Sequence, residues 1–229
     1  LRIGVINELK DISVSSEMKD VFERRINDLK SSGAEIIEIS IPHIMNTGVM
    51  YGVISRAEAS SNLARYDGMR YGLRVEGSDL GDTYMKTRAA GFGNNVKFRL
   101  MTGSIMLTHD FYEPCYVQAA KVRRIIDNDF IAGFEKCDLI VTPSAMGVAF
   151  KLNDDLTDKE SDECAAMLIA ANMSGLPACS VPAGRNKDGL PLGIQVIGRR
   201  FDDVRVLQMA REIEKIVDLD NRPTIIMGK

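Results

Sequence analysis

The sequence contains no tryptophan, only two histidines and only four cysteines in 229 residues. Two imidazoles are too few for a histidine-rich metal site, and no cysteine pair has the C-x-x-C spacing of a zinc or redox motif. We therefore expect reduced thiols and no metal bound to this chain. No apolar run approaches the ~20 residues that a membrane helix needs, and no signal peptide is visible.

Charge of one sign is also lacking. The chain carries 32 acidic and 29 basic residues, a net charge of −3, which gives no overall electrostatic case for binding nucleic acid. A hydrophobic content of 45% is enough for one large core. The chain opens directly on the strand-like run LRIGVI without an initiator Met, and we take it to be a piece of a longer polypeptide; removal of a leader would produce a similar start.

Hydrophobic periodicity predicts one α/β domain with a partly parallel sheet, because its first elements alternate as strand, helix, strand. A tight turn at Asp188-Gly189 predicts that the last two strands form a hairpin. The strands are expected at residues 1–6, 34–42, 137–144, 176–184 and 190–198. The helices are expected at residues 16–32, 47–64, 81–90, 94–107, 112–135, 163–175 and 202–217.

The segment ARYDGMRYGLR, residues 64–74, concentrates three arginines, two tyrosines and two glycines. One interpretation is an anion or RNA contact, because guanidinium groups are planar donors and tyrosine offers a stacking face. The other is a structural network in which Asp67 and the arginines Arg65, Arg70 and Arg74 hold the loop. The residues alone favour the structural network, since arginine clusters on surfaces are common.

Three further stretches carry candidate chemistry. GFGNNVKFRL, residues 91–100, enters a helix, and Arg99 in its early turns could hold a carboxylate with two hydrogen bonds; a solvated basic face is the alternative.

The charged run at residues 121–130 is expected to be a solvated helix face, and its Asp127 and Asp129 do not share a face as paired carboxylates would. The serines lack the strand–turn–helix context of a nucleophile elbow, so no nucleophile is identified.

Six segments of the chain can be read together: AEASSNLARYDGMRYGLR, TRAAGFGNNVKFRLMTGS, YVQAAKVRRIIDNDF, CDLIVTPS, NMSGLPACSVPAG and GLPLGIQVIGRRFDD. In this order they are similar to the C-terminal half of the amidase-signature family. Within it they resemble the glutamine-hydrolysing A subunits of tRNA-dependent amidotransferases, for which ARYDGMRYG is characteristic.

This resemblance implies a mixed β-sheet flanked by helices, of which residues 1–229 are the C-terminal portion of a single domain. It implies that the A subunit hydrolyses glutamine and passes ammonia to a B subunit, where a glutamyl ester on tRNA, activated with ATP and Mg, is amidated. A C subunit braces the pair. The tRNA would be met indirectly through the complex, in the bacterial cytoplasm or an organellar matrix, with no membrane contact and no cofactor in this chain.

The family's catalysis uses a lysine and two serines, the serines lying in a stretch of the type GGSSGGS. No such stretch is present, so the catalytic residues are expected upstream of Leu1 and the chain alone should be inactive. The resemblance assigns Arg99 to the substrate α-carboxylate and Tyr51 to the pocket lining.

Two positions depart from the family pattern. Gly52 replaces a second tyrosine, and Ala165 stands where an aspartate would hold the substrate α-ammonium. On a helix, the nearby Asp162 and Glu163 would point elsewhere. These departures leave open a fragment of another amide hydrolase of the family. A separate alternative is a non-catalytic scaffold paralogue that only binds partner subunits.

Overall fold

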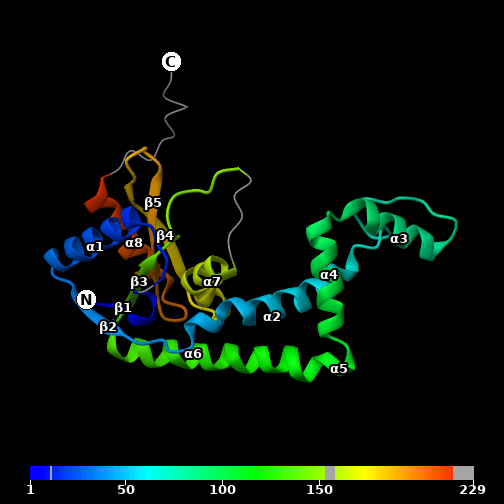
Figure 1. Cartoon of the computed structure of the whole chain (residues 1–229), viewed down its shortest axis with the longest axis horizontal. Coiled ribbons are helices and arrows are strands. Elements are labelled where there is room, and N and C mark those ends of the chain that lie inside the picture. The colour runs from blue at the N-terminus through cyan, green and yellow to red at the C-terminus, as the bar shows by residue number, and fades with distance from the viewer. Residues whose placement is uncertain (11, 153–157, 219–229) are drawn as a thin grey trace, which may run out of the picture. The chain divides into compact units, whose positions relative to one another are not determined.

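The computed structural model describes residues 1–10, 12–152 and 158–218, with the side chains of residues 158, 159 and 162 also outside the description. Two compact units are formed, one from Leu1–Gly48 with Arg123 onward and the other from Val49–Val122 (Figure 1).

A five-stranded mixed sheet organises the first unit, in the order β2-β1-β3-β5-β4. Strand β1 pairs in parallel with β2 and β3, and β5 pairs antiparallel with β3 and β4. The predicted mixed α/β sheet and the predicted hairpin are therefore confirmed. The strands are β1 (Arg2–Ile6), β2 (Glu35–Ile39), β3 (Leu139–Pro143), β4 (Ala178–Arg185) and β5 (Pro191–Ile197).

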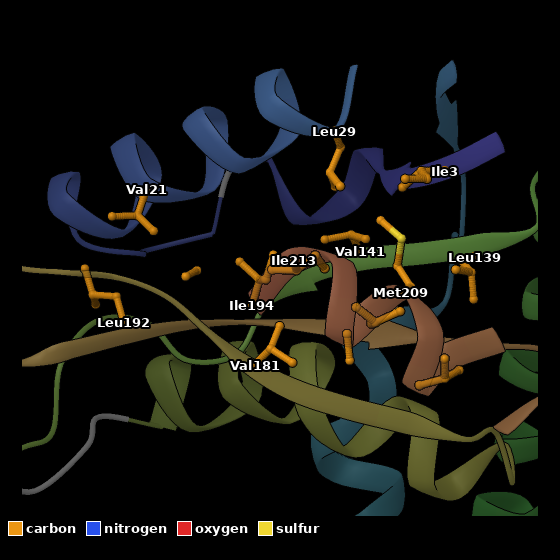
Figure 2. Close-up of a cluster of buried hydrophobic side chains, with 14 of the residues drawn as sticks. Ile3, Val21, Leu29, Leu139, Val141, Val181, Leu192, Ile194, Met209 and Ile213 are labelled. Atoms are coloured by element: carbon orange, nitrogen blue, oxygen red, sulfur yellow. The ribbon is translucent and has the colours of Figure 1, made fainter. Parts of the chain in front are cut away.

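Helices cover both faces of this sheet. One face packs against α1 (Ser16–Ser31) and α8 (Asp203–Val217), and Figure 2 shows Val21 and Leu29 pointing from α1 towards the sheet. On the other face lie α7 (Asp158–Met173) and the part of α6 (Gln118–Lys136) that belongs to this unit. Two 3₁₀ turns complete the unit, η1 (Asn7–Leu9) and η2 (Ile44–Asn46).

Local chemistry explains where α1 begins and ends. The Ser15 hydroxyl accepts a hydrogen bond from the backbone N–H of Met18 at 3.1 Å, which caps one of the free donors of the first turn. Gly33 follows the helix at φ +91°, a conformation that costs glycine little.

The second unit is helical. It contains most of α2 (Thr47–Asn62), then η3 (Leu63–Arg65), α3 (Leu80–Gly91), α4 (Asn94–Met106) and α5 (His109–Phe111). The predicted long helix from residue 112 begins with a π-helical stretch, η4 (Tyr112–Val117), before α6. Pro114 lies in this stretch, and proline disrupts regular α-helical hydrogen bonding because it lacks an N–H and its ring clashes with the preceding turn.

Candidate functional site

Helices α2 and α4 of the second unit pack against each other through a glycine. A Cβ at Gly103 would lie 2.0 Å from the carbonyl oxygen of Arg56, so only glycine allows the two backbones this close. Beside this contact the hydroxyls of Ser60 and Ser104 are hydrogen-bonded at 2.8 Å, and the Arg56 guanidinium lies 5.7 Å from the centre of the Phe98 ring. The contact fixes which face of α4 is turned away from α2.

Arg99 and Tyr51, the two residues assigned to a substrate pocket, lie on these two helices. The Arg99 side chain is exposed on α4, and its Nε donates to Asn95 Oδ1 at 3.0 Å, one turn earlier. This bond engages one edge of the guanidinium only. Tyr51 is half-buried on α2. The two side chains share one compact unit, and no hydrogen bond joins them within the described residues.

The arginine-rich segment is held by short-range contacts. Asp67 accepts a hydrogen bond from the backbone N–H of Met69 at 2.9 Å, and this bond, assisted by the Arg70 guanidinium, lowers the pKa of the Asp67 carboxyl. Arg74 instead pairs with Glu76, through Nε at 2.7 Å, and this bond lowers the pKa of Glu76. Arg65 forms no ion pair within the described part of the chain.

The guanidinium that anchors the segment belongs to Arg88, on α3. It donates to the carbonyl oxygens of Leu63 and Tyr66 at 2.9 and 3.1 Å, and it lies 4.9 Å from the centre of the Phe92 ring. From one turn before Arg88 on the same helix, the Tyr84 hydroxyl donates to the Ala64 carbonyl at 2.8 Å. The sequence did not single out Arg88, because no local pattern distinguishes it from other helical arginines.

A second helix α3 contact fixes the far end of the same segment. Thr87 Oγ1 accepts from the backbone N–H of Val75 at 3.0 Å and donates to its carbonyl at 3.3 Å. Thr83 Oγ1 accepts from the N–H of Gly77 at 2.9 Å. Both threonines are buried, so these bonds are shielded from competing water. Residues 64–79 are therefore anchored to α3 at both ends of the segment.

In the first unit, two serine hydroxyls from the strands on either side of β5 meet. Ser144, just after β3, and Ser180, on β4, are hydrogen-bonded at 2.7 Å. A nucleophilic serine needs a base within hydrogen-bond reach. His43 is engaged instead with Asp129, at 2.9 Å from Nδ1 to Oδ2, so it gives this pair no support.

Helix α7 presents no carboxylate at the position of Ala165. The Ala165 side chain is buried, and the neighbouring Glu163 is 3% exposed. The Glu163 carboxylate accepts hydrogen bonds from the N–H and hydroxyl of Ser13, at 3.0 and 3.3 Å, and so is directed to the loop before α1. Asp162, the other acid considered there, has its side chain outside the described residues.

The prediction that the charged run at residues 121–130 is a solvated helix face is wrong for Asp127, which is buried. Its side chain is only 6% exposed. It receives hydrogen bonds from Arg200 at 2.5 Å and from Arg124 at 3.0 Å, and Arg200 also donates to the carbonyl of Ser174 at 2.9 Å. Sequence periodicity could not show this, since Arg200 follows β5, 73 residues later.

A cleft in the first unit has a volume of about 580 Å³ and lies between α1 and strands β1, β2 and β3. Its apolar walls include Phe22, Ile26 and Ile36, and a Lys10–Glu38 ion pair of 2.6 Å lies at its rim. None of the residues assigned to catalysis or binding lines it. Across residues 1–10, 12–152 and 158–218, no cluster of His, Cys, Asp and Glu could hold a metal, and all four cysteines are free.

The model of the amidase family matches residues 1–207. This chain belongs to the amidase family. Curated relatives in the family include the glutamyl-tRNA(Gln) amidotransferase A subunit of Zymomonas mobilis, 42% identical over 97% of this chain and 46% of that protein. The A subunit from Caldanaerobacter subterraneus is 43% identical over 100% of this chain and 47% of that protein.

Solved amidase-family structures agree with the observed sheet. The glutamyl-tRNA(Gln) amidotransferase A subunit of Thermotoga maritima superposes with a TM-score of 0.70 at 33% identity, over 94% of this chain and 42% of that one. A bacterial aryl acylamidase, at 20% identity and a TM-score of 0.70, shows the same fold. The chain thus spans about half the length of the amidase relatives it matches. No helix in the described part is long and apolar enough to cross a membrane.

Proposed function

We propose that this chain is the C-terminal portion of the A subunit of a glutamyl-tRNA(Gln) amidotransferase. In the complete protein this subunit hydrolyses glutamine and supplies ammonia for conversion of Glu-tRNA(Gln) to Gln-tRNA(Gln). One observation carries the proposal. Identity to A subunits named for this activity is 42–43% over nearly the whole chain, whereas a solved aryl acylamidase of the same fold is 20% identical.

In this proposal the chain supplies binding groups and the rest of the domain supplies the catalytic lysine and serines. Arg99 receives the substrate α-carboxylate. Its exposed guanidinium, held at one edge by Asn95, keeps further N–H donors for a carboxylate. Tyr51 lines the pocket from α2. Residues 1–229 alone hydrolyse nothing, because an acyl-transfer enzyme without a nucleophile keeps only its positioning groups.

The partners follow from the same proposal. The complete A subunit works with a B subunit, which uses ATP and Mg to activate the glutamyl ester, and with a bracing C subunit. It meets tRNA through that complex, in the bacterial cytoplasm or an organellar matrix. The segment at residues 64–79, anchored to α3, presents Arg65 and Arg70 at its surface, as a partner-facing loop would.

A second candidate is hydrolysis of another amide by an enzyme of the same family. The observation that favours it is the absence of a carboxylate for an α-ammonium group among the described side chains near Ala165 on α7. Ala165 is buried, and the Glu163 carboxylate is already bound to Ser13. A substrate without a charged amino group would need no such partner.

The complete gene product, with its B and C subunits, separates these alternatives. Ammonia release from glutamine is measured against release from acetamide, together with formation of Gln-tRNA(Gln) in the presence of ATP. Preference for glutamine with tRNA amidation supports the A-subunit function. Preference for acetamide supports the general amidase. Co-purification with the B and C partners and no ammonia from either substrate supports a scaffold.

A further inference from the structure

The cleft between α1 and the sheet lies where the path of the chain reverses across the sheet. Strand β1 is flanked by β2 and β3, and all three strands run in the same direction. The chain passes from β1 to β2 through α1, on one face of the sheet, and reaches β3 through α6, on the other face. In α/β sheets, ligands bind in the crevice outside the carboxyl ends of the strands at such a switch point.

The cleft reaches these strand ends. Ile6 and Pro143, the last residues of β1 and β3, both line it. Val141, another lining residue, points from β3 towards α1 (Figure 2). The volume of about 580 Å³ lies within the range of roughly 300–1,000 Å³ that is typical of small-molecule sites. Position and size are therefore those of a site for a small molecule.

The interior of the cleft is apolar. Its walls include half-buried side chains from α1 and two strands, namely Val5, Phe22, Ile26 and Ile36. The hydroxyl of Thr142, which also lines the cleft, already accepts a hydrogen bond from Gln195 Nε2 at 3.3 Å. A polar group placed between these walls would lose its hydrogen bonds to water without replacement. The body of a ligand that fits here is therefore apolar.

The exposed charged residues at the rim of the cleft balance one another. Lys10 and Glu38 form an ion pair of 2.6 Å on the side of the sheet. On the helix side lie Lys19 and Glu23, one turn apart on α1. With two lysines and two glutamates, the rim gives neither an anion nor a cation a net attraction. The complementary ligand is therefore uncharged.

We propose that this cleft binds a small uncharged aromatic compound, with the ring of the ligand held between Phe22 and the aliphatic walls. Aromatic side chains favour aromatic ligands because edge-to-face and offset contacts add to the burial of apolar area. Neither Arg99 nor Tyr51 lines the cleft, so the inference goes beyond the proposed function and does not rest on it.

Two fluorescent dyes that differ by one charge test the class of ligand. N-phenyl-1-naphthylamine is uncharged, and 8-anilinonaphthalene-1-sulfonate carries a sulfonate on the same ring system. Each dye is titrated with the chain until its fluorescence saturates. The uncharged dye is expected to bind at one site per chain, at least about tenfold more tightly than the sulfonate. Equal affinities, or tighter binding of the sulfonate, would overturn the proposal of an uncharged ligand.

Substitutions on β2 test the location. Ile36→Trp places an indole in the cleft and should weaken binding of the uncharged dye at least about tenfold. Ile37→Trp is the matched control, because successive side chains of a strand point to opposite faces and Ile37 does not line the cleft. Far-UV circular dichroism verifies that both variants are folded. Equal affinities of the two variants would place the dye elsewhere and contradict the site.

Charge reversal at the rim is a second test that leaves the apolar walls intact. Glu23→Lys gives the rim an excess of positive charge and should tighten binding of the sulfonate dye at least about threefold, with no change for the uncharged dye. Asp20→Lys makes the same change of charge at an exposed position of α1 outside the cleft and should affect neither dye. Equal effects of the two substitutions on the sulfonate dye would overturn the location.

The titration is repeated on the complete gene product. The uncharged dye should bind there too, and Ile36→Trp should weaken it by the same factor as in the chain alone. Loss of dye binding in the complete protein would overturn the proposal, because the rest of the polypeptide would then fill the cleft. Glutamine hydrolysis is measured separately, so failure of the proposed function and failure of this site give different results.

Discussion

Gly103 on α4 and Arg56 on α2 approach so closely that a Cβ on Gly103 would lie 2.0 Å from the Arg56 carbonyl oxygen. That oxygen belongs to a helix backbone and cannot move aside as a flexible side chain could. The contact therefore ties the geometry of the candidate binding helix to a single residue without a side chain.

Gly103→Ala should lower the free energy of unfolding of the second unit by about 3 kcal/mol, at the upper end of the usual cost of overpacking. Urea denaturation followed by far-UV circular dichroism measures it, since the chain has no tryptophan. Gly52→Ala on α2 is the control. A Cβ there meets nothing within 4 Å, and the substitution should stabilise by ~0.5–1 kcal/mol. Equal effects of the two substitutions would contradict the close packing of α2 and α4.

Arg88→Ala should release the loop at residues 64–79. The side chain makes two hydrogen bonds to main-chain carbonyls and contacts the Phe92 ring, together about 2 kcal/mol of local stability. Trypsin should then cleave after Arg70 and Arg74 roughly 30-fold faster, because a loss of about 2 kcal/mol raises the population of the opened loop by about that factor. Lys86→Ala, which removes an exposed ion pair with Asp82 on the same helix, should leave the cleavage rate unchanged.

Arg200→Ala should destabilise the first unit by about 2–4 kcal/mol. It leaves the buried Asp127 carboxylate without its closer partner and the Ser174 carbonyl without its donor. Arg124→Ala should cost only about 0–1 kcal/mol, because the Arg124 side chain is 69% exposed. Urea unfolding of both variants measures how much free energy of unfolding each substitution removes. A larger loss for Arg124→Ala would show that Asp127 depends on the exposed partner.

Cys137 should resist alkylation at pH 8 while the half-buried Cys115 and Cys179 react. Its side chain has no exposed surface, and burial raises the pKa of its thiol to about 11, so little thiolate is present. Peptide mass spectrometry after treatment with iodoacetamide measures the three sites, and all should react in denaturant. Rapid native modification of Cys137 would contradict its burial.

The raised pKa also predicts a pH dependence of stability. The unfolded thiol ionises near pH 9 and the folded one near pH 11, so the contribution of the protonated thiol is complete below about pH 9 and is lost as pH rises towards 11. The free energy of unfolding should fall by about 2–3 kcal/mol more in the native sequence than in Cys137→Ala over this interval. If the free energy of unfolding changed with pH in the same way in the native sequence and in Cys137→Ala, the expectation would be contradicted.

Arg99→Ala in the complete protein should lower kcat/KM for glutamine by about 30-fold to 1000-fold, equivalent to ~2–4 kcal/mol of transition-state binding. Arg99→Lys should recover little of this loss, since an ammonium group cannot form the paired hydrogen bonds of a guanidinium. Lys97→Ala on the same helix is the control and should leave glutamine kinetics near those of the native sequence. Unchanged kinetics in Arg99→Ala would remove this residue from the pocket.

The sequence by itself determined the strands, most of the helices and the family. Alternation in LRIGVI, the 3.6-residue period of residues 16–32 and the Asp188-Gly189 turn are local signals, and each of these elements formed where its own residues predicted it. The resemblance carried by ARYDGMRYG and the other segments is likewise a property of the residue order, and the amidase-family match over residues 1–207 confirms it.

Only the tertiary structure decided which polar side chains meet. Glu163 bonds to Ser13 across 150 positions, Asp127 to Arg200 across 73, and Arg88 to Leu63 across 25. A side chain's direction depends on how its element is rotated against its neighbours, and that rotation follows from packing contacts such as Gly103 on Arg56. Residue order sets the faces of each helix, but the partner of each face exists only once the chain has folded.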